Sequence, residues 1–230
     1  MTFTLNGIGT QTYGKLNRLE RADHCDHCQT LGTLQSYDTT KYFVILFVPL
    51  IPLGKLRILD HCQRCNRWRQ VNLKKWQHDK EAALRSALDG LKRNHQDADA
   101  VRTALATATQ FQDQTLLLKL KSLVDTMTHD HETQILYASA SIYFGNPQEA
   151  ITPLKHAIAA HDTRETREHL AATLLEIGDS QQAEQYVDYV WKEPDPTHLP
   201  MCRAIAEAYQ QSNDHAAAID GATESATRRD

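Results

Sequence analysis

The sequence predicts a two-domain protein: a small all-β domain over residues 1–76, followed by an all-α helical-repeat domain over residues 77–230. Three observations predict this division. Residues 1–80 hold 12 Lys/Arg against 6 Asp/Glu, a net charge of +6, whereas residues 81–230 hold 13 against 23, a net charge of −10. Four of the five cysteines lie within residues 25–65. Near residue 74, β-branched and aromatic runs broken by glycine and proline give way to Ala, Leu, Gln, Glu and Asp.

The composition and the N-terminus favour a globular chain in the cytoplasm. Hydrophobic residues make up 41% of the chain and charged residues 23%, which is typical of globular proteins. The N-terminal residues show no basic segment followed by an apolar one, so no secretory signal is expected. The longest apolar run, YFVILFVPLIPL, covers residues 42–53. It is shorter than the ~18–20 residues of a spanning helix, so we expect no membrane insertion.

Two C-x2-C motifs predict a metal site. Cys25 and Cys28 form the first motif, and Cys62 and Cys65 form the second. Two thiolates so spaced on a tight turn can both reach one tetrahedral ion at about 2.3 Å. Four thiolates fill the coordination sphere of zinc and leave no position for a catalytic water, so we expect structural Zn²⁺. Iron is an alternative at the same ligands. Two disulfides or four free thiols are the remaining alternatives, and a chain without an export signal disfavours the disulfides.

Three histidines, His24, His27 and His61, flank these motifs. A histidine can replace a thiolate as a zinc ligand. We expect all three to lie outside the ligand set, because each motif already supplies both of its thiolates.

The segments between the two motifs predict a small antiparallel sheet. Residues 29–38 read as a strand with turn residues nearby, and residues 41–48 as a β-branched and aromatic strand. Residues 49–54 contain Pro49, Pro52 and Gly54, which predict that the strand ends and the chain turns. In residues 55–61, Leu56 and Ile58 alternate with charged residues until Leu59 breaks the pattern. Residues 67–73 follow the second motif. We therefore expect the apolar run to be a central strand shielded from solvent, with the metal supplying part of the folding energy.

Together, HCDHC, YFVILFVPLIPLGK and HCQRC resemble bacterial zinc-ribbon domains, in which an aromatic-rich strand and a Pro-x-x-Pro turn lie between two cysteine knuckles. The resemblance covers roughly residues 8–75 and implies a structural zinc held by Cys25, Cys28, Cys62 and Cys65. Such knuckles often carry glycine after the second cysteine, where φ is positive. Here Gln29 and Asn66 follow, and glutamine tolerates that conformation less well than asparagine. We therefore expect the first knuckle to be the less regular one.

A helical pattern with an internal repeat begins near residue 78. Gly145 and Gly178 are 33 residues apart, and small or aliphatic residues follow each at matching offsets. A third copy places Ser212 at the glycine position, and a degenerate upstream copy starts at Phe111. A period near 34 with paired helices resembles tetratricopeptide (TPR) repeats over about residues 97–225. A plain helical bundle with a coincidental period is the alternative.

The TPR resemblance implies a partner-binding groove, because the first helix of each TPR pair lines the concave face. The residues of this sequence at those positions are mainly acidic, aromatic or aliphatic. They are Glu132, Ile135, Ser139, Ile142, Tyr143, Glu165, Glu168, Ala172, Leu175, Glu176 and Tyr209. Such a surface suits a protein or peptide with basic residues and an apolar anchor.

No catalytic motif is apparent: the sequence holds no G-x-S-x-G, phosphate-binding glycine loop or H-E-x-x-H. We expect a non-enzymatic, zinc-binding protein-interaction adaptor. The alternative is a nucleic-acid-binding protein, because arginine, lysine and tryptophan suit phosphates and base stacking. The residues that suggest it are Arg57, Arg64, Arg67, Trp68, Arg69, Lys74 and Lys75. We favour the view that this basic surface packs against the acidic helical half.

Overall fold

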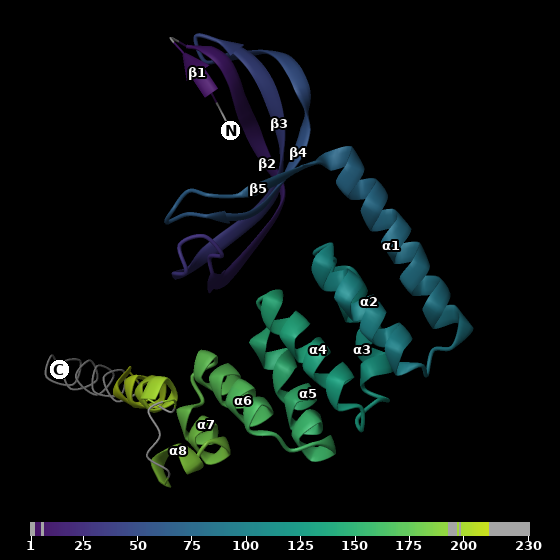
Figure 1. The fold of residues 1–230 in the computed structure, drawn as a ribbon, viewed down its shortest axis with the longest axis vertical. Coiled ribbons are helices and arrows are strands. Elements are labelled where there is room, and N and C mark those ends of the chain that lie inside the picture. The colour runs from purple at the N-terminus through teal and green to yellow at the C-terminus, as the bar shows by residue number, and fades with distance from the viewer. Residues whose placement is uncertain (1–2, 6, 193–196, 198, 212–230) are drawn as a thin grey trace, which may run out of the picture. The chain divides into compact units, whose positions relative to one another are not determined.

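The computed structural model describes residues 3–5, 7–192, 197 and 199–211 (Figure 1). It divides into two compact units. The first runs to Leu118 and includes Tyr143–Gly145, and the second comprises Lys119–Ile142 and the chain from Asn146 onward. The division between these two units falls within helix α3 (Gln114–Val124).

The first unit contains an antiparallel sheet that, among the described residues, has five strands in sequence order (Figure 1). The strands are β1 (Phe3–Leu5), β2 (Ile8–His24), β3 (Leu31–Ile45), β4 (Val48–Cys62) and β5 (Arg69–Asn72). Strands β2, β3 and β4 are 17, 15 and 15 residues long. The expectation of a small all-β zinc ribbon over residues 1–76 is therefore wrong: the cysteines lie at one end of a large sheet whose strands continue far beyond them.

The position of the hairpin turn explains this error. Strand β3 runs unbroken to Ile45, and the turn consists of Leu46 and Phe47, with φ values of 47° and 65°. Strand β4 then continues through Pro49 and Pro52, where we expected the chain to turn. Proline is tolerated there because β5 pairs only with residues 56–59 of β4, which leaves the other edge of the proline-containing stretch unpaired. Two of the three β3–β4 register shifts lie in this stretch, and each absorbs an extra residue of β4.

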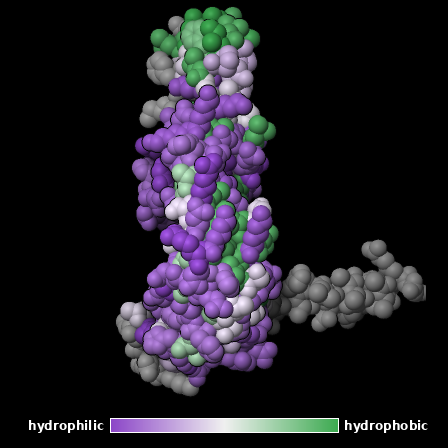
Figure 2. Space-filling model, turned by 90° about the vertical axis from the view of Figure 1, so that its right-hand side faces the viewer, coloured by the Kyte–Doolittle hydropathy of each residue, from purple (hydrophilic) through white to green (hydrophobic). Residues whose placement is uncertain are grey.

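The apolar run of residues 42–53 is largely exposed. Val44 is buried, but the side chains from residue 45 to residue 53 are all exposed. The expectation that the domain shields this run is therefore wrong, because no described element packs over this end of the sheet. Figure 2 shows the resulting group of hydrophobic side chains at its top, where Figure 1 places the β3–β4 turn.

Two helices complete most of the first unit: α1 (Leu73–Arg93) and α2 (Ala98–Gln110). Helix α1 starts directly after β5 because the Asn72 side chain accepts hydrogen bonds from the backbone N–H groups of Lys74 and Lys75. Trp76 of α1 packs against Phe111, with ring centroids 5.1 Å apart.

A buried polar cluster joins the sheet to the turn between α2 and α3. The Arg57 guanidinium donates to Asp38 at 2.9 Å and to the Gln112 side-chain oxygen at 2.6 Å. The Gln112 amide nitrogen donates in turn to the hydroxyls of Ser36, at 3.1 Å, and Tyr143, at 2.9 Å. These bonds satisfy both terminal nitrogens of Arg57, although its buried Nε has no hydrogen-bond partner, so a charged side chain can remain in the interior of the unit.

The helices beyond α3 are α4 (His131–Tyr143), α5 (Pro147–Ala160), α6 (Arg164–Glu176), α7 (Ser180–Tyr186) and α8 (Tyr189–Lys192), and residues 199–211 are also helical. In the second unit α5, α6 and α7 pack in succession (Figure 1). Their contacts form a core that includes Leu154, Leu170, Leu174 and Val187. The described part of the second unit is therefore all-helical, as the sequence predicts for this part of the chain.

The helical turns repeat at the backbone level. Gln112, Gly145 and Gly178 have φ values of 54°, 77° and 85°, and each lies two residues before a helix. They are 33 residues apart. The upstream copy therefore starts at Gln112 and not at Phe111, and a glutamine adopts the left-handed conformation that glycine adopts in the other two copies. The copy expected at Ser212 lies outside the described residues.

Candidate metal centre

The four cysteines lie in two turns at the same end of the sheet. Cys25 follows β2 and Cys28 precedes β3, whereas Cys62 ends β4 and Cys65 lies in the turn before β5. The β3–β4 register pairs Leu34 with Cys62, which brings the two turns together. Leu34 is buried against Cys25 and Cys62. Strand pairing thus gathers cysteines that are far apart in sequence.

Both turns share one hydrogen-bond pattern. In the first, Gln29 N–H donates to Cys25 O at 2.8 Å, and in the second Asn66 N–H donates to Cys62 O at 2.9 Å. Gln29 and Asn66 have φ values of 53° and 57°. The expectation of a less regular first knuckle is therefore wrong, because glutamine adopts the positive φ that the pattern needs.

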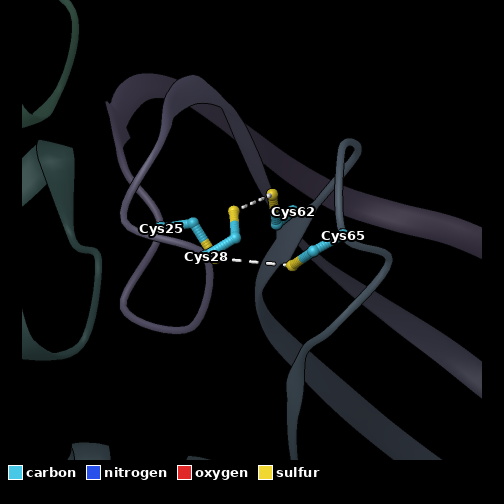
Figure 3. A group of neighbouring side chains, drawn as sticks. All are labelled: Cys25, Cys28, Cys62 and Cys65. Carbon is cyan, nitrogen blue, oxygen red and sulfur yellow. Dashed lines mark hydrogen bonds between the residues drawn. The ribbon is translucent and has the colours of Figure 1, made fainter.

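The four sulfur atoms point toward one another (Figure 3). Cys25 Sγ lies 3.6 Å from Cys65 Sγ, Cys28 Sγ lies 4.0 Å from Cys62 Sγ, and all four lie within 4.8 Å of one another. A disulfide requires about 2.05 Å, so the cysteines are free thiols. Four thiolates at about 2.3 Å from one tetrahedral ion lie about 3.8 Å apart. The observed spacing therefore fits a single metal ion.

The surroundings of the cluster affect thiol ionisation. The Thr30 hydroxyl shares a hydrogen bond with Cys28 Sγ at 2.8 Å and lowers the pKa of that thiol to about 6. Burial raises the pKa of the Cys65 thiol to about 12. A metal ion must therefore displace a proton from Cys65, which makes metal affinity dependent on pH. Thr30 was not identified from the sequence, because its contact with Cys28 follows from the fold of the turn.

The flanking histidines lie outside the cluster. Among the described residues, the group of side chains placed to hold a metal comprises the four cysteines alone. His24 and His27 are exposed. His61 bonds to the Asn66 side-chain oxygen at 2.8 Å and packs edge-on against Trp68. Through these contacts His61 can support the second turn without binding the ion itself.

The residues expected to line a groove are on accessible positions of the helices. Glu132, Glu165 and Glu176 are exposed or half-buried, and Ile135 and Leu175 are half-buried. The other expected groove residues are likewise exposed or half-buried: Ser139, Ile142, Tyr143, Glu168, Ala172 and Tyr209.

Tyr143, Glu168 and Tyr209 have partners within their own compact units. The Tyr143 ring stacks under the Arg21 guanidinium. Glu168 accepts hydrogen bonds from Arg164 and from the Tyr189 hydroxyl. Tyr209 donates to Glu184. Binding of a partner through these three side chains would compete with existing contacts.

The residues that suggested nucleic-acid binding do not form one accessible surface. Arg57 is only 6% exposed and is held by Asp38 and Gln112, so it cannot reach a phosphate. Arg69 pairs with Asp60 at 2.7 Å. The half-buried Trp68 ring packs against His61. The exposed basic residues that remain are Arg64, Arg67, Lys74 and Lys75. The structure does not support the nucleic-acid alternative.

Among the described residues, no helix is both long and apolar enough to cross a bilayer.

Comparison with known proteins gives only distant likenesses. No protein-family model matches the chain, and no curated protein matches it significantly. Two solved structures of MamA are 19% and 20% identical, with TM-scores of 0.48 and 0.47. They cover 64% and 61% of this chain and 81% and 82% of their own. TTC0263, a thermophilic TPR protein in Thermus thermophilus, is 18% identical with a TM-score of 0.40, and the match covers 57% of this chain and 73% of that one. Likeness at this level does not transfer a function.

Proposed function

We propose that this protein is a non-enzymatic, cytoplasmic adaptor in which four cysteines hold one structural zinc ion and the helices bind a protein or peptide. The observation that carries the metal part is the position of four free thiols within 4.8 Å of one another. Free thiols persist in a reducing compartment, which supports a cytoplasmic location.

A structural role follows from the donor set and its position. Four sulfur ligands suit zinc or iron and fill a tetrahedral sphere, which leaves no open position for substrate. The ion would link the turn after β2 to the turn after β4, and so would hold together segments that meet only through strand pairing. Cys25 and Cys62 are buried, which limits access to the centre. The expected contribution of the ion is therefore stability of the sheet end.

Peptide binding is supported by the acidic surface of the helices. The accessible carboxylates of Glu165 and Glu176 lie on α6, and Glu176 directly follows the half-buried Leu175. On α4, Glu132 is accessible and Ile135 is half-buried. Carboxylates beside accessible aliphatic side chains favour a ligand with basic residues and an apolar anchor, because charge steers the approach and the anchor supplies contact energy.

The test uses the full chain as bait. Proteins captured from the native lysate are identified, and the affinity of each for the bait is measured at two salt concentrations. Glu165→Lys with Glu176→Lys should weaken the true partner and leave helical content unchanged, because both side chains are accessible. Glu168 is a poor choice for this test because it also bonds to Arg164 and Tyr189.

The matched control is Glu149→Lys, an exposed charge reversal on α5 outside the expected groove. The groove assignment would be wrong if a partner bound the double variant and the wild-type bait with equal affinity and equal salt dependence.

A further inference from the structure

The sheet carries an exposed apolar tip at the end opposite the cysteines. We define the apolar tip as the exposed hydrophobic residues of the β1–β2 and β3–β4 turns and the first part of β4: Leu5, Ile8, Ile45, Leu46, Phe47, Val48, Leu50, Ile51 and Leu53. The two turns touch, since a Cβ atom on Gly7 would lie 3.2 Å from Leu46 Cα. Figure 2 shows a green group of hydrophobic side chains at its top. Exposed patches of this kind mark binding surfaces for proteins or membranes.

The tip is built as a defined structure. The Tyr13 hydroxyl donates to the Phe47 carbonyl at 2.6 Å, and the Tyr13 and Tyr42 rings meet edge to face at 5.8 Å. Val44 is fully buried beneath it. The hairpin end therefore has its own small interior, and its exposed side chains are held in place on the outside.

The turn residues are unusual for their backbone conformation. Leu46 is 73% exposed and Phe47 is 60% exposed, although both have positive φ. Two-residue hairpin turns with positive φ at both positions favour Asn-Gly, because large side chains are strained there. Two bulky apolar residues therefore oppose hairpin stability at this position. Such a cost points to a function for the side chains themselves.

The apolar surface surrounds the strand end instead of facing one side. Consecutive residues from 45 to 53 are exposed, and successive side chains of a strand point to opposite faces. A second copy of this chain, or a folded partner with a flat face, would cover one side and leave the other in water. A lipid bilayer can surround both sides at once.

The charge next to the tip is uniformly basic. Lys41 and Lys55 flank the apolar run in sequence and occupy neighbouring positions of the β3–β4 register, where Lys55 pairs with Thr40 and Lys41 pairs with Gly54. Residues 3–19 and 39–59 contain no Asp or Glu. Lysines beside an inserted apolar segment attract anionic headgroups, and tyrosines such as Tyr42 suit the headgroup level.

We propose that the apolar tip inserts into one leaflet of an anionic lipid bilayer, with Lys41 and Lys55 at the headgroups, and so binds the protein to a membrane surface. The tip is a hairpin end of the sheet, so the attachment is peripheral. It departs from the expectation of no membrane insertion, which considered only a spanning helix.

The experiment is vesicle flotation of the purified full chain. Vesicles of phosphatidylcholine mixed with phosphatidylglycerol should carry the protein, and vesicles of phosphatidylcholine alone should carry less. Leu46→Asn with Phe47→Gly should lower binding at least about tenfold, since two large apolar side chains are lost. The same change supplies the preferred turn residues, so the variant should fold and melt at the same or a higher temperature. Lys41→Gln with Lys55→Gln should remove most of the preference for the anionic vesicles.

Leu16→Asn is the matched control, because Leu16 is an exposed leucine of β2 outside the tip; it should float like the wild type. Absence of flotation with both vesicle types would overturn the proposal, as would equal flotation of the turn variant. Sedimentation velocity tests the alternative that a second copy of this chain binds the apolar tip. A dimer that the turn variant dissociates, without lipid binding by the wild type, would make the tip an interface between two copies.

Discussion

The guanidinium of Arg57 lies 2.9 Å from a carboxylate oxygen of Asp38, and both side chains are buried. The pair joins β4 to β3 across the interior face of the sheet. Asn17 also donates to Asp38, at 2.6 Å, and Gln112 accepts from Arg57. Removing one member of such a buried pair destabilises the folded protein, because the other charge then stays buried without a counter-charge.

We therefore expect Arg57→Met to destabilise the protein by about 3–5 kcal/mol, the usual cost of removing one member of a buried pair. Urea unfolding measures the loss. Lys55→Met is the control, an exposed cation two residues earlier on the same strand, and it should change the free energy of unfolding by less than about 0.5 kcal/mol. Equal effects of the two changes would contradict the role given to the cluster.

Purified protein should contain one metal ion per chain, and Cys62→Ser should abolish its binding. Removing one of four ligands leaves an open and weaker site, so the sheet end should also become susceptible to proteolysis. Elemental analysis gives both the amount and the identity of the metal. Cys202→Ser is the matched control, because Cys202 lies outside the cluster. Freshly purified protein with neither zinc nor iron would refute the metal site.

The start of α3 should depend on Asp113. One carboxylate oxygen of Asp113 accepts from Leu116 N–H at 3.0 Å, and the other pairs with Lys80 at 2.9 Å. Asp113→Ala removes both contacts and should cost about 1–2 kcal/mol. Asp113→Asn can retain the cap and should cost less. The measurement is the free energy of unfolding at neutral pH, and a larger cost for asparagine than for alanine would contradict the capping role.

The pKa of Asp113 also predicts how the stability of the protein changes at acidic pH. Burial raises the pKa of Asp113, but the hydrogen bond and the charge of Lys80, together with hydrogen bonds from the backbone N–H groups of Leu116 and Thr115, outweigh burial, so the pKa is lowered overall. A carboxyl with a lowered folded-state pKa stabilises the protein above its unfolded pKa of about 3.9. That contribution is lost as the pH falls through the folded-state value. Stability measured down the acid range should fall less steeply in Asp113→Asn than in the wild type.

The burial of His169 predicts that the stability of the protein depends on pH near neutrality. Burial lowers the pKa of His169 in the folded protein. The unfolded chain then binds the proton first, near pH 6.5, so stability falls as the pH drops below about that value. The melting temperature of His169→Gln should therefore decline less between neutral and mildly acidic pH. His95→Gln, at an exposed position, is the control. Identical pH profiles for the wild type and His169→Gln would contradict this prediction.

Local signals in the sequence were enough to identify the candidate metal ligands and the helical turns. Two C-x2-C motifs specify four cysteine ligands because the ligand spacing is a property of a single turn. Gly145 and Gly178 mark helix boundaries because a left-handed residue strongly favours glycine. Gln112 shows where such signals fail: it adopts the same conformation with no glycine to mark it, and its side chain is held by Arg57 and Tyr143.

The extent of the sheet, the burial of Arg57 and the exposure of Leu46 and Phe47 depended on contacts between distant segments. Pro49 and Pro52 can end a strand or lie within one, and the choice depends on whether the neighbouring edge is paired. Arg57 and Lys55 lie two residues apart, yet only Arg57 meets a buried carboxylate and amide. An apolar run becomes core only where another element covers it, and no described element covers the β3–β4 turn. Hydrophobicity specifies what a side chain would gain from burial, but packing between elements decides whether it is buried.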